Sequence, residues 1–251
     1  MKKPYTDAGK AFMEALTNWL QDTRLISEGV SRLFSDYQRD GRIDFSDISW
    51  PKPKKPNEMP DAKRFDIKAV QLSHRMEGLL KEVWSSRFVF LETLWEEYLQ
   101  DLMIEIRHHD ASVFEPFCEK DFMCGLIRDV LTDQVGSIED IKEEAAARFA
   151  AGLTRQAWNQ QWKQLTRLNI GLRDSDKDEP WYPKLDEYFE IRNCIIHAQG
   201  RVSAQLKGKN TYYADRDTIE IWPNQLDYYR HQFIACLLYI EGKFRAKFAS
   251  P

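Results

Sequence analysis

The residues best suited to chemistry lie in one short segment, EYFEIRNCIIHAQG, which runs from Glu187 to Gly200. Its periodicity predicts a helix in which Arg192 falls near the middle of a broad apolar arc. An arginine keeps its charge under essentially all conditions, so burying it without a partner costs several kcal/mol. We therefore expect an anion beside it: a carboxylate from another helix such as Glu92 or Glu96, a partner chain, or a phosphate.

A narrow polar stripe follows another side of the same helix and consists of Asp186, Glu190, Asn193 and His197. Histidine titrates near neutral pH and can take or give a proton. On an ideal helix Arg192 and His197 point about 140° apart, so they do not face a single point. They could still act together if Arg192 lies at an interface with a second copy of the chain and the helix departs from ideal geometry before Gly200.

Other constellations carry weaker signals. The run His108-His109-Asp110 could suggest a metal, but it falls at the expected end of a helix, where adjacent side chains point apart. Cys194 and His197 have a Cys-x2-His spacing without a second pair at a distance typical of zinc sites. Glycine-rich phosphate loops and nucleophile elbows are absent from the sequence. We predict no metal and no cofactor.

Composition limits the classes of protein further. The chain has 251 residues, with 36 basic against 40 acidic side chains and a formal charge of −4, which disfavours a protein that coats nucleic acid indiscriminately. Four scattered cysteines suit reduced, buried thiols better than a disulfide framework. The N-terminal segment lacks an uninterrupted apolar stretch, and no run reaches the length of a membrane span. The expected location is the cytoplasm, without membrane attachment.

Helical periodicity dominates the chain and predicts an all-α helical bundle. An N-terminal helical extension is expected over 1–48, a proline- and lysine-rich connector over 49–63, and the main helical domain over 64–251. Whether one long helix runs through Ser85-Ser86 or breaks there is left open. The stretch KGKNTYYADRDTIEIWP predicts a small β-hairpin before a last long helix that opens at Pro223.

The segment RNCIIHAQGRV resembles the signature of the HEPN superfamily, the higher eukaryotes and prokaryotes nucleotide-binding domain. Its ribonuclease members carry Arg, a polar residue, three variable positions and then His at the end of a helix, which Arg192, Asn193 and His197 match. Gly200 follows where related proteins often leave the helix. The resemblance covers roughly residues 61–251 and fits an all-helical chain with one more long helix after the motif.

The resemblance implies a metal-independent endoribonuclease that uses the substrate's own 2′-hydroxyl as nucleophile. His197 would then be the acid–base group, Arg192 would clamp the phosphate, and Asn193 would orient the imidazole. Glu190 is a further candidate for that supporting role. Family members typically meet across a two-fold axis at the motif helices, which implies a homodimer. RNA is the implied substrate.

The same resemblance suggests a prokaryotic toxin or an antiviral abortive-infection effector, with a possible antitoxin or defence-system partner. Arg201, Lys207 and Lys209 follow the motif and could bind flanking phosphates, although a solvated loop carries such charges routinely. Two alternatives from other classes stay open. One is a catalytically silent HEPN-like scaffold or regulatory partner. The other is an unrelated helical adaptor in which Arg192 is simply salt-bridged.

Overall fold

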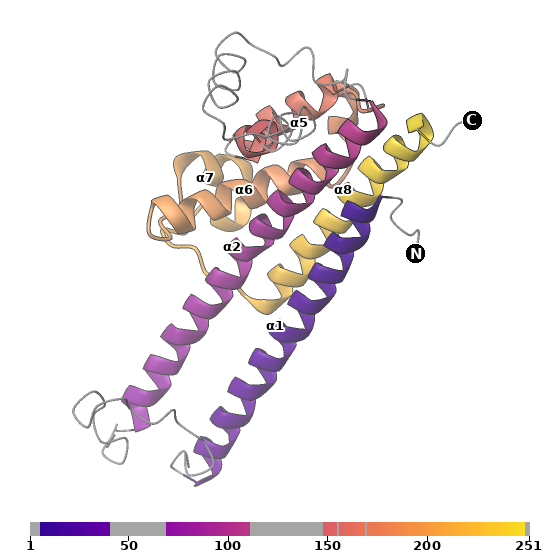
Figure 1. Ribbon diagram of the computed structural model, residues 1–251. Coiled ribbons are helices and arrows are strands. Elements are labelled where there is room, and N and C mark those ends of the chain that lie inside the picture. The colour runs from indigo at the N-terminus through magenta and orange to yellow at the C-terminus, as the bar shows by residue number, and fades with distance from the viewer. Residues whose placement is uncertain (1–5, 41–68, 111–147, 155, 169, 249–251) are drawn as a thin grey trace, which may run out of the picture. The chain divides into compact units, whose positions relative to one another are not determined.

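The protein is built from helices (Figure 1). A computed structural model describes residues 6–40, 69–110, 148–154, 156–168 and 170–248. The elements, with η for 3-10 helices, are α1 (Asp7–Asp40), α2 (Ala69–His109), α5 (Trp158–Arg167), η3 (Asp174–Asp178), α6 (Tyr182–His197), α7 (Ala204–Lys209), η4 (Thr211–Tyr213) and α8 (Pro223–Phe248). The predicted all-α class is therefore confirmed. Among these residues, none of the helices has both the length and the apolar character needed to cross a bilayer.

The chain divides into two compact units. The first combines Met1–Asn18 with Trp84–Pro251 and contains α5, α6, α7 and α8, and the second is Trp19–Val83. Because α2 is continuous from Ala69 to His109, the chain does not break at Ser85-Ser86. The predicted connector, 49–63, lies outside the described residues, so the predicted domain boundaries stay predictions.

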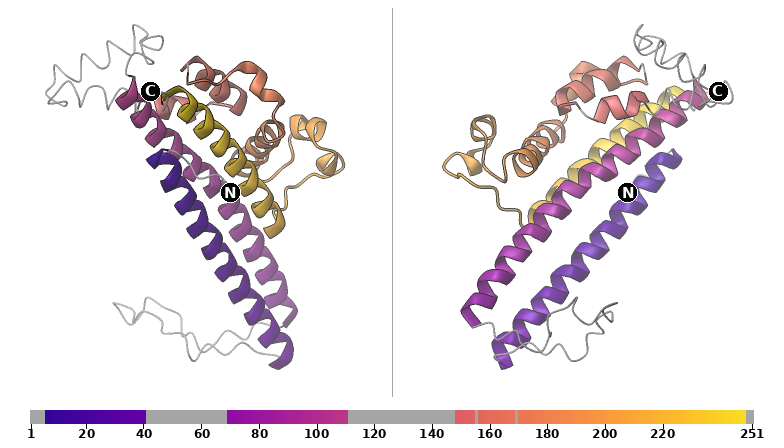
Figure 2. Two further views of the ribbon diagram at one scale, coloured as in Figure 1. Left: turned by 90° about the vertical axis from the view of Figure 1, so that its right-hand side faces the viewer. Right: turned by 60° about the vertical axis from the view of Figure 1, so that its left-hand side comes forward.

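Aromatic side chains fill the core of the first unit. Trp95 of α2 lies at its centre, fully buried, with ring contacts to Phe12 of α1, Trp158 of α5 and Phe233 of α8. The views in Figure 2 agree that α8 runs alongside the C-terminal half of α2. Burying large aromatic surface is the main contribution to stability that a helical bundle of this kind can make.

The start of α1 is held in this unit by two carboxylates. The backbone N–H of Thr6 donates to Glu241 of α8 over 2.7 Å, and the N–H of Ala8 donates to Glu105 of α2 over 2.6 Å. These acceptors satisfy backbone donors that a helix N-terminus leaves unpaired, and their charge complements the helix dipole. The first helical turns thus belong to the same unit as α6.

The predicted β-hairpin is wrong. In place of its first strand the chain forms α7 and η4, because Ser203 caps α7 by accepting from the N–H of Leu206 and Leu206 is fully buried beneath it. In the second half of the stretch, Thr218 makes an isolated antiparallel bridge with Arg201, which precedes α7. A cap and a buried leucine outweighed the β-propensity of neighbouring tyrosines, which is a weaker, context-dependent effect.

Candidate functional site

Helix α6 positions most of the candidate residues. Pro183 lies in its first turn, where its fixed backbone angle is already helical. At the other end the chain leaves the helix through Gln199 and Gly200, whose φ angles are 53° and 77°, and the N–H of Gly200 donates to the carbonyl of Cys194. Gly200 takes up this left-handed conformation at little cost because it has no Cβ.

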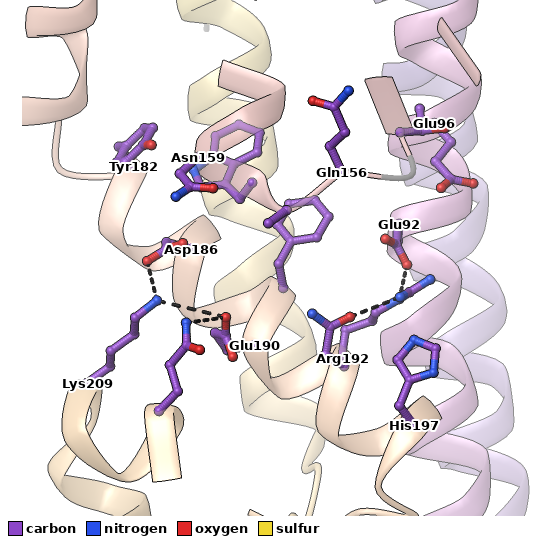
Figure 3. Close-up of a pocket in the computed structure, with 16 residues that line it drawn as sticks. Glu92, Glu96, Gln156, Asn159, Tyr182, Asp186, Glu190, Arg192, His197 and Lys209 are labelled. Atoms are coloured by element: carbon purple, nitrogen blue, oxygen red, sulfur yellow. Dashed lines mark hydrogen bonds and ion pairs between the residues drawn. The ribbon is translucent and has the colours of Figure 1, made fainter. Parts of the chain in front are cut away.

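A cavity of about 470 Å³ opens beside α6. Figure 3 shows the polar residues that surround it, from α2, the segment before α5, α5, α6 and α7. Its lining residues are Glu92, Glu96, Thr154, Gln156, Ala157, Trp158, Asn159, Tyr182, Asp186, Phe189, Glu190, Arg192, Asn193, His197, Gln205 and Lys209. The volume falls within the range of small-molecule and nucleotide sites.

The cavity brings together the residues that the motif predicts. Arg192, Asn193 and His197 all line it, and so do Glu190 and Lys209. The whole predicted polar stripe of α6 therefore faces one space. Arg192 joins it although it leaves the helix in a different direction, because its side chain is long enough to turn back toward the cavity.

Arg192 has its anion within the same chain. Its Nε contacts a carboxylate oxygen of Glu92 on α2, and its Nη1 donates to Oδ1 of Asn193 over 3.0 Å (Figure 3). The Glu92 side chain is only 7% exposed and that of Arg192 is 23% exposed. Asn193 thus contacts the guanidinium, whereas the family resemblance implied that it would orient His197.

Burial also changes the acidity of Glu92. Its loss of hydration raises the pKa of this carboxyl from 4.5 to about 7, against the opposing effect of Arg192, and the nearby charge of Glu96 adds to the rise. Near neutral pH the carboxyl is therefore present in both protonation states. The charge that faces Arg192 therefore depends on pH near neutrality.

The three predicted substrate-binding residues do not lie at one place. Lys209 lies at the α7 side of the cavity, where its Nζ is 2.7 Å from Asp186 and 4.0 Å from Glu190. Arg201 and Lys207 do not line the cavity. Lys207 instead forms an ion pair with the exposed Asp217 at 3.1 Å. Of the three cations predicted to bind phosphates, only Lys209 lines the cavity.

Several residues that line the cavity belong to no motif that the sequence shows. Gln156 and Asn159 precede or begin α5, and Gln205 lies in α7 and donates to Glu190 over 2.7 Å. Polar side chains in short connections are common everywhere in a sequence. Only the packing of α5 and α7 against α6 assigns these three to a site.

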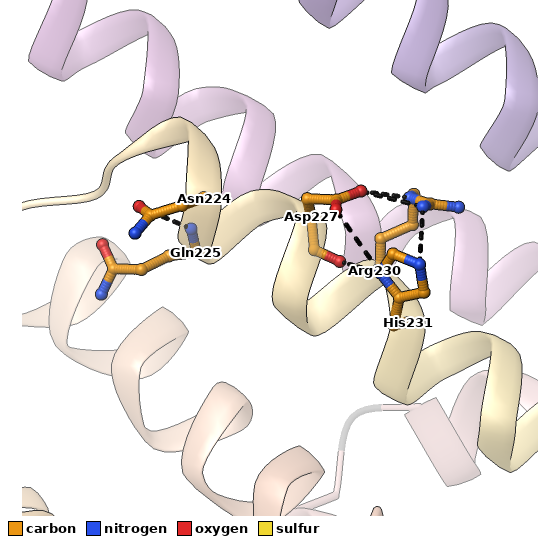
Figure 4. A network of polar contacts seen from close by, with 5 residues as sticks. All are labelled: Asn224, Gln225, Asp227, Arg230 and His231. Atoms are coloured by element: carbon orange, nitrogen blue, oxygen red, sulfur yellow. Dashed lines mark hydrogen bonds and ion pairs between the residues drawn. The ribbon is translucent and has the colours of Figure 1, made fainter.

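Two other histidines, His231 and His109, lie in surroundings that differ from those of His197. On α8, His231 contacts the backbone carbonyl of Asp227 at 2.7 Å, and Arg230 donates to the Asp227 carboxylate over 2.8 Å (Figure 4). These contacts join residues one turn apart on the solvent-exposed face of α8, as is ordinary for charged surface residues. At the end of α2, the His109 ring lies against Phe244 and Phe248. Neither histidine lines the cavity.

Two further observations bear on the chemistry of the cavity. Within the described ranges, no group of three or more His, Cys, Asp or Glu side chains is arranged to hold a metal ion. The cavity is lined by two permanent cations against four carboxylates, which are Glu92, Glu96, Asp186 and Glu190. No protein-family model, curated protein or solved structure matches this chain.

Proposed function

We propose that the protein is a metal-independent endoribonuclease of the HEPN type. One observation carries this proposal: Arg192, Asn193 and His197, the three residues that resemble the family signature, line a single cavity of about 470 Å³. For cleavage by a 2′-hydroxyl, a histidine can transfer protons and an arginine can stabilise the charge that develops on the phosphoryl oxygens.

In this reaction the 2′-oxygen attacks the adjacent phosphorus, and the bond from phosphorus to the 5′-oxygen of the next nucleotide breaks. The 2′-hydroxyl loses its proton and the leaving 5′-oxygen gains one. His197 would take the first proton or give the second, since it is exposed at the end of α6 and borders the cavity. The products are a 2′,3′-cyclic phosphate and a 5′-hydroxyl. DNA would resist cleavage because it lacks the attacking group.

Arg192 keeps one amino group available for a phosphate. Its Nε faces Glu92 and its Nη1 donates to Asn193, while Nη2 has no partner among the described residues. These contacts hold the guanidinium plane in one orientation and leave one amino group to bind a phosphoryl oxygen. The raised pKa of Glu92 supports the same role, because a carboxyl that is part-protonated near neutral pH competes less with a phosphate.

The ion pair also favours a second candidate function. If Glu92 holds Arg192 too tightly for substrate to enter, the bundle is a catalytically silent scaffold or regulatory partner. The same contact would suit the simpler adaptor in which Arg192 is salt-bridged. The scaffold and the adaptor both predict no cleavage, and the enzyme predicts cleavage that depends on His197.

The test is to incubate the purified chain with single-stranded RNA in excess chelator, beside the variants His197→Ala and Arg192→Ala. His231→Ala is the matched control, because it removes an exposed histidine that lies on α8 and does not line the cavity. We expect cleavage by the wild type and the control and a loss of about a hundredfold or more in both site variants. Absence of cleavage in the wild type, or equal cleavage in all four proteins, would refute the proposal.

The proposal extends to the biological setting that the resemblance implies. We propose a homodimer with the α6 helices at its two-fold axis, and a role as a prokaryotic toxin or antiviral effector with a restraining partner. The apolar arc of α6 is largely buried in its own chain and Arg192 has its own Glu92, so neither feature requires a second copy. The support for the homodimer is the family resemblance alone.

A further inference from the structure

We propose that the α7 side of the cavity binds a guanine base of the RNA strand, an inference that rests on the proposed ribonuclease function for its biological meaning. The base would be read through the carboxylates of Asp186 and Glu190 and the ammonium of Lys209. The chain would then cut next to guanine rather than at any sequence.

The cavity has two chemically different halves. One half holds Arg192 and His197, which suit a phosphodiester, and the other is formed where α7 faces Asp186 and Glu190 of α6. In that second half Lys209 reaches from α7 toward Asp186 and Glu190, and its ammonium does not contact the arginine (Figure 3). A phosphate would be repelled by two carboxylates, so this half suits a different part of a nucleotide.

Only some of the carboxylate oxygens in this half accept a hydrogen bond or an ion pair. Lys209 contacts Oδ2 of Asp186, and Gln205 donates to Oε1 of Glu190, while Oδ1 of Asp186 and Oε2 of Glu190 have no partner among the described residues. The Glu190 side chain is 19% exposed and that of Asp186 is 30% exposed, so both are reachable from the cavity. Two free acceptors beside one ammonium donor define the pattern that a ligand must complement.

Guanine has that complementary pattern. Its N1–H and N2 amino groups are neighbouring donors that can meet carboxylate oxygens, and its O6 lies beside them as an acceptor for Lys209. Adenine and cytosine each place an acceptor next to their amino group, and uracil has a single N–H between two carbonyls. Each of these bases would set a lone pair against a carboxylate, whereas guanine would not.

The spacing along α6 agrees with one nucleotide in the cavity. Glu190 and His197 are seven residues apart on the helix, which is about 10 Å along its axis. A base can therefore lie at the α7 half while the phosphate attached to its ribose lies near Arg192 and His197. Phe189 and Trp158, stacked on each other with centroids 5.5 Å apart, also line the cavity and contribute apolar surface to it.

The experiment is equilibrium binding of nucleoside 3′-monophosphates, which the protein cannot cleave. We expect guanosine 3′-monophosphate to bind about tenfold or more tightly than the adenosine, cytidine and uridine forms. Inosine 3′-monophosphate is the decisive probe, because it lacks only the N2 amino group and should lose most of that preference. Equal binding of all five nucleotides, or no loss with inosine, would overturn the inference.

Variants of the cavity residues test whether the guanine base binds at the α7 side of the cavity. Glu190→Gln keeps the shape of the side chain but replaces one acceptor by a donor, so it should abolish the preference for guanine, and Lys209→Met should weaken guanine binding by removing the donor to O6. Asp217→Asn is the control, since it removes an exposed carboxylate that pairs with Lys207 outside the cavity. A preference that survives in Glu190→Gln, or disappears equally in Asp217→Asn, would place the base elsewhere.

The two proposals can fail separately. RNA cleavage without preference for guanine, together with equal nucleotide binding, would refute the guanine site and leave the ribonuclease. Selective binding of the guanine nucleotide that Glu190→Gln abolishes, together with no cleavage of any RNA, would leave the site and refute the ribonuclease.

Discussion

The substitution Glu92→Gln tests the electrostatics of the cavity directly. Glu92 is buried in α2 against Arg192, and burial raises its pKa from 4.5 to about 7. Between these pH values the folded chain keeps a proton on Glu92 that the unfolded chain has already released. The free energy of unfolding of the wild type therefore falls as pH rises through this interval. A glutamine at this position cannot titrate, so the free energy of unfolding of the variant lacks this decrease with pH.

The magnitude follows from the width of the interval. Each pH unit between 4.5 and about 7 is worth about 1.4 kcal/mol, which amounts to roughly 3 kcal/mol over the whole range. The free energy of unfolding of Glu92→Gln minus that of the wild type should therefore grow by roughly 3 kcal/mol from pH 4.5 to pH 7.5. Losing the contact to Arg192 adds an offset, but only the change with pH is compared.

Urea unfolding followed by tryptophan fluorescence suits this measurement, because Trp95, Trp158 and Trp162 are buried in the unit that contains the cavity. Glu97→Gln, an exposed carboxylate on the same helix, controls for the loss of a charge. A difference that stays constant across the range would show that burial does not raise the pKa. If the ion pair outweighed burial and lowered the pKa of Glu92, the difference would instead fall with pH, mainly below pH 4.5.

Three further outcomes are expected. Tyr188→Phe should lower the free energy of unfolding by about 1 kcal/mol, measured by urea unfolding, because the buried hydroxyl donates to the carbonyl of Phe88 over 2.7 Å; no change would mean that this bond contributes nothing. Gly171→Ala should cost about 1–2 kcal/mol, because Gly171 has a φ of 89° that side chains rarely adopt; a neutral result would contradict the left-handed backbone there. Light scattering should find a dimer that Ile196→Glu converts to a monomer, since Ile196 is a 42% exposed apolar residue of α6, and a monomeric wild type would refute the predicted assembly.

The local features of α6 could be predicted from the sequence. Pro183 and Gly200 define its ends because their backbone preferences act on their own residues, and the 3.6-residue period assigns Leu185 and Tyr188 to the buried side. The need for an anion beside Arg192 follows equally from the charge of one side chain, and Glu92 was among the candidates. These inferences require only neighbouring residues or the properties of a single group.

The tertiary structure decided what those properties could not. Glu92 and Arg192 are a hundred positions apart, so only the packing of α2 against α6 selects Glu92 over Glu96 and removes enough water to raise its pKa. Lys209 lies in α7 and not in the predicted hairpin, because Ser203 caps a helix over the buried Leu206. In α7 its ammonium contacts Asp186. Local preferences specify an element and its faces, but the contacts of a long side chain depend on which elements meet.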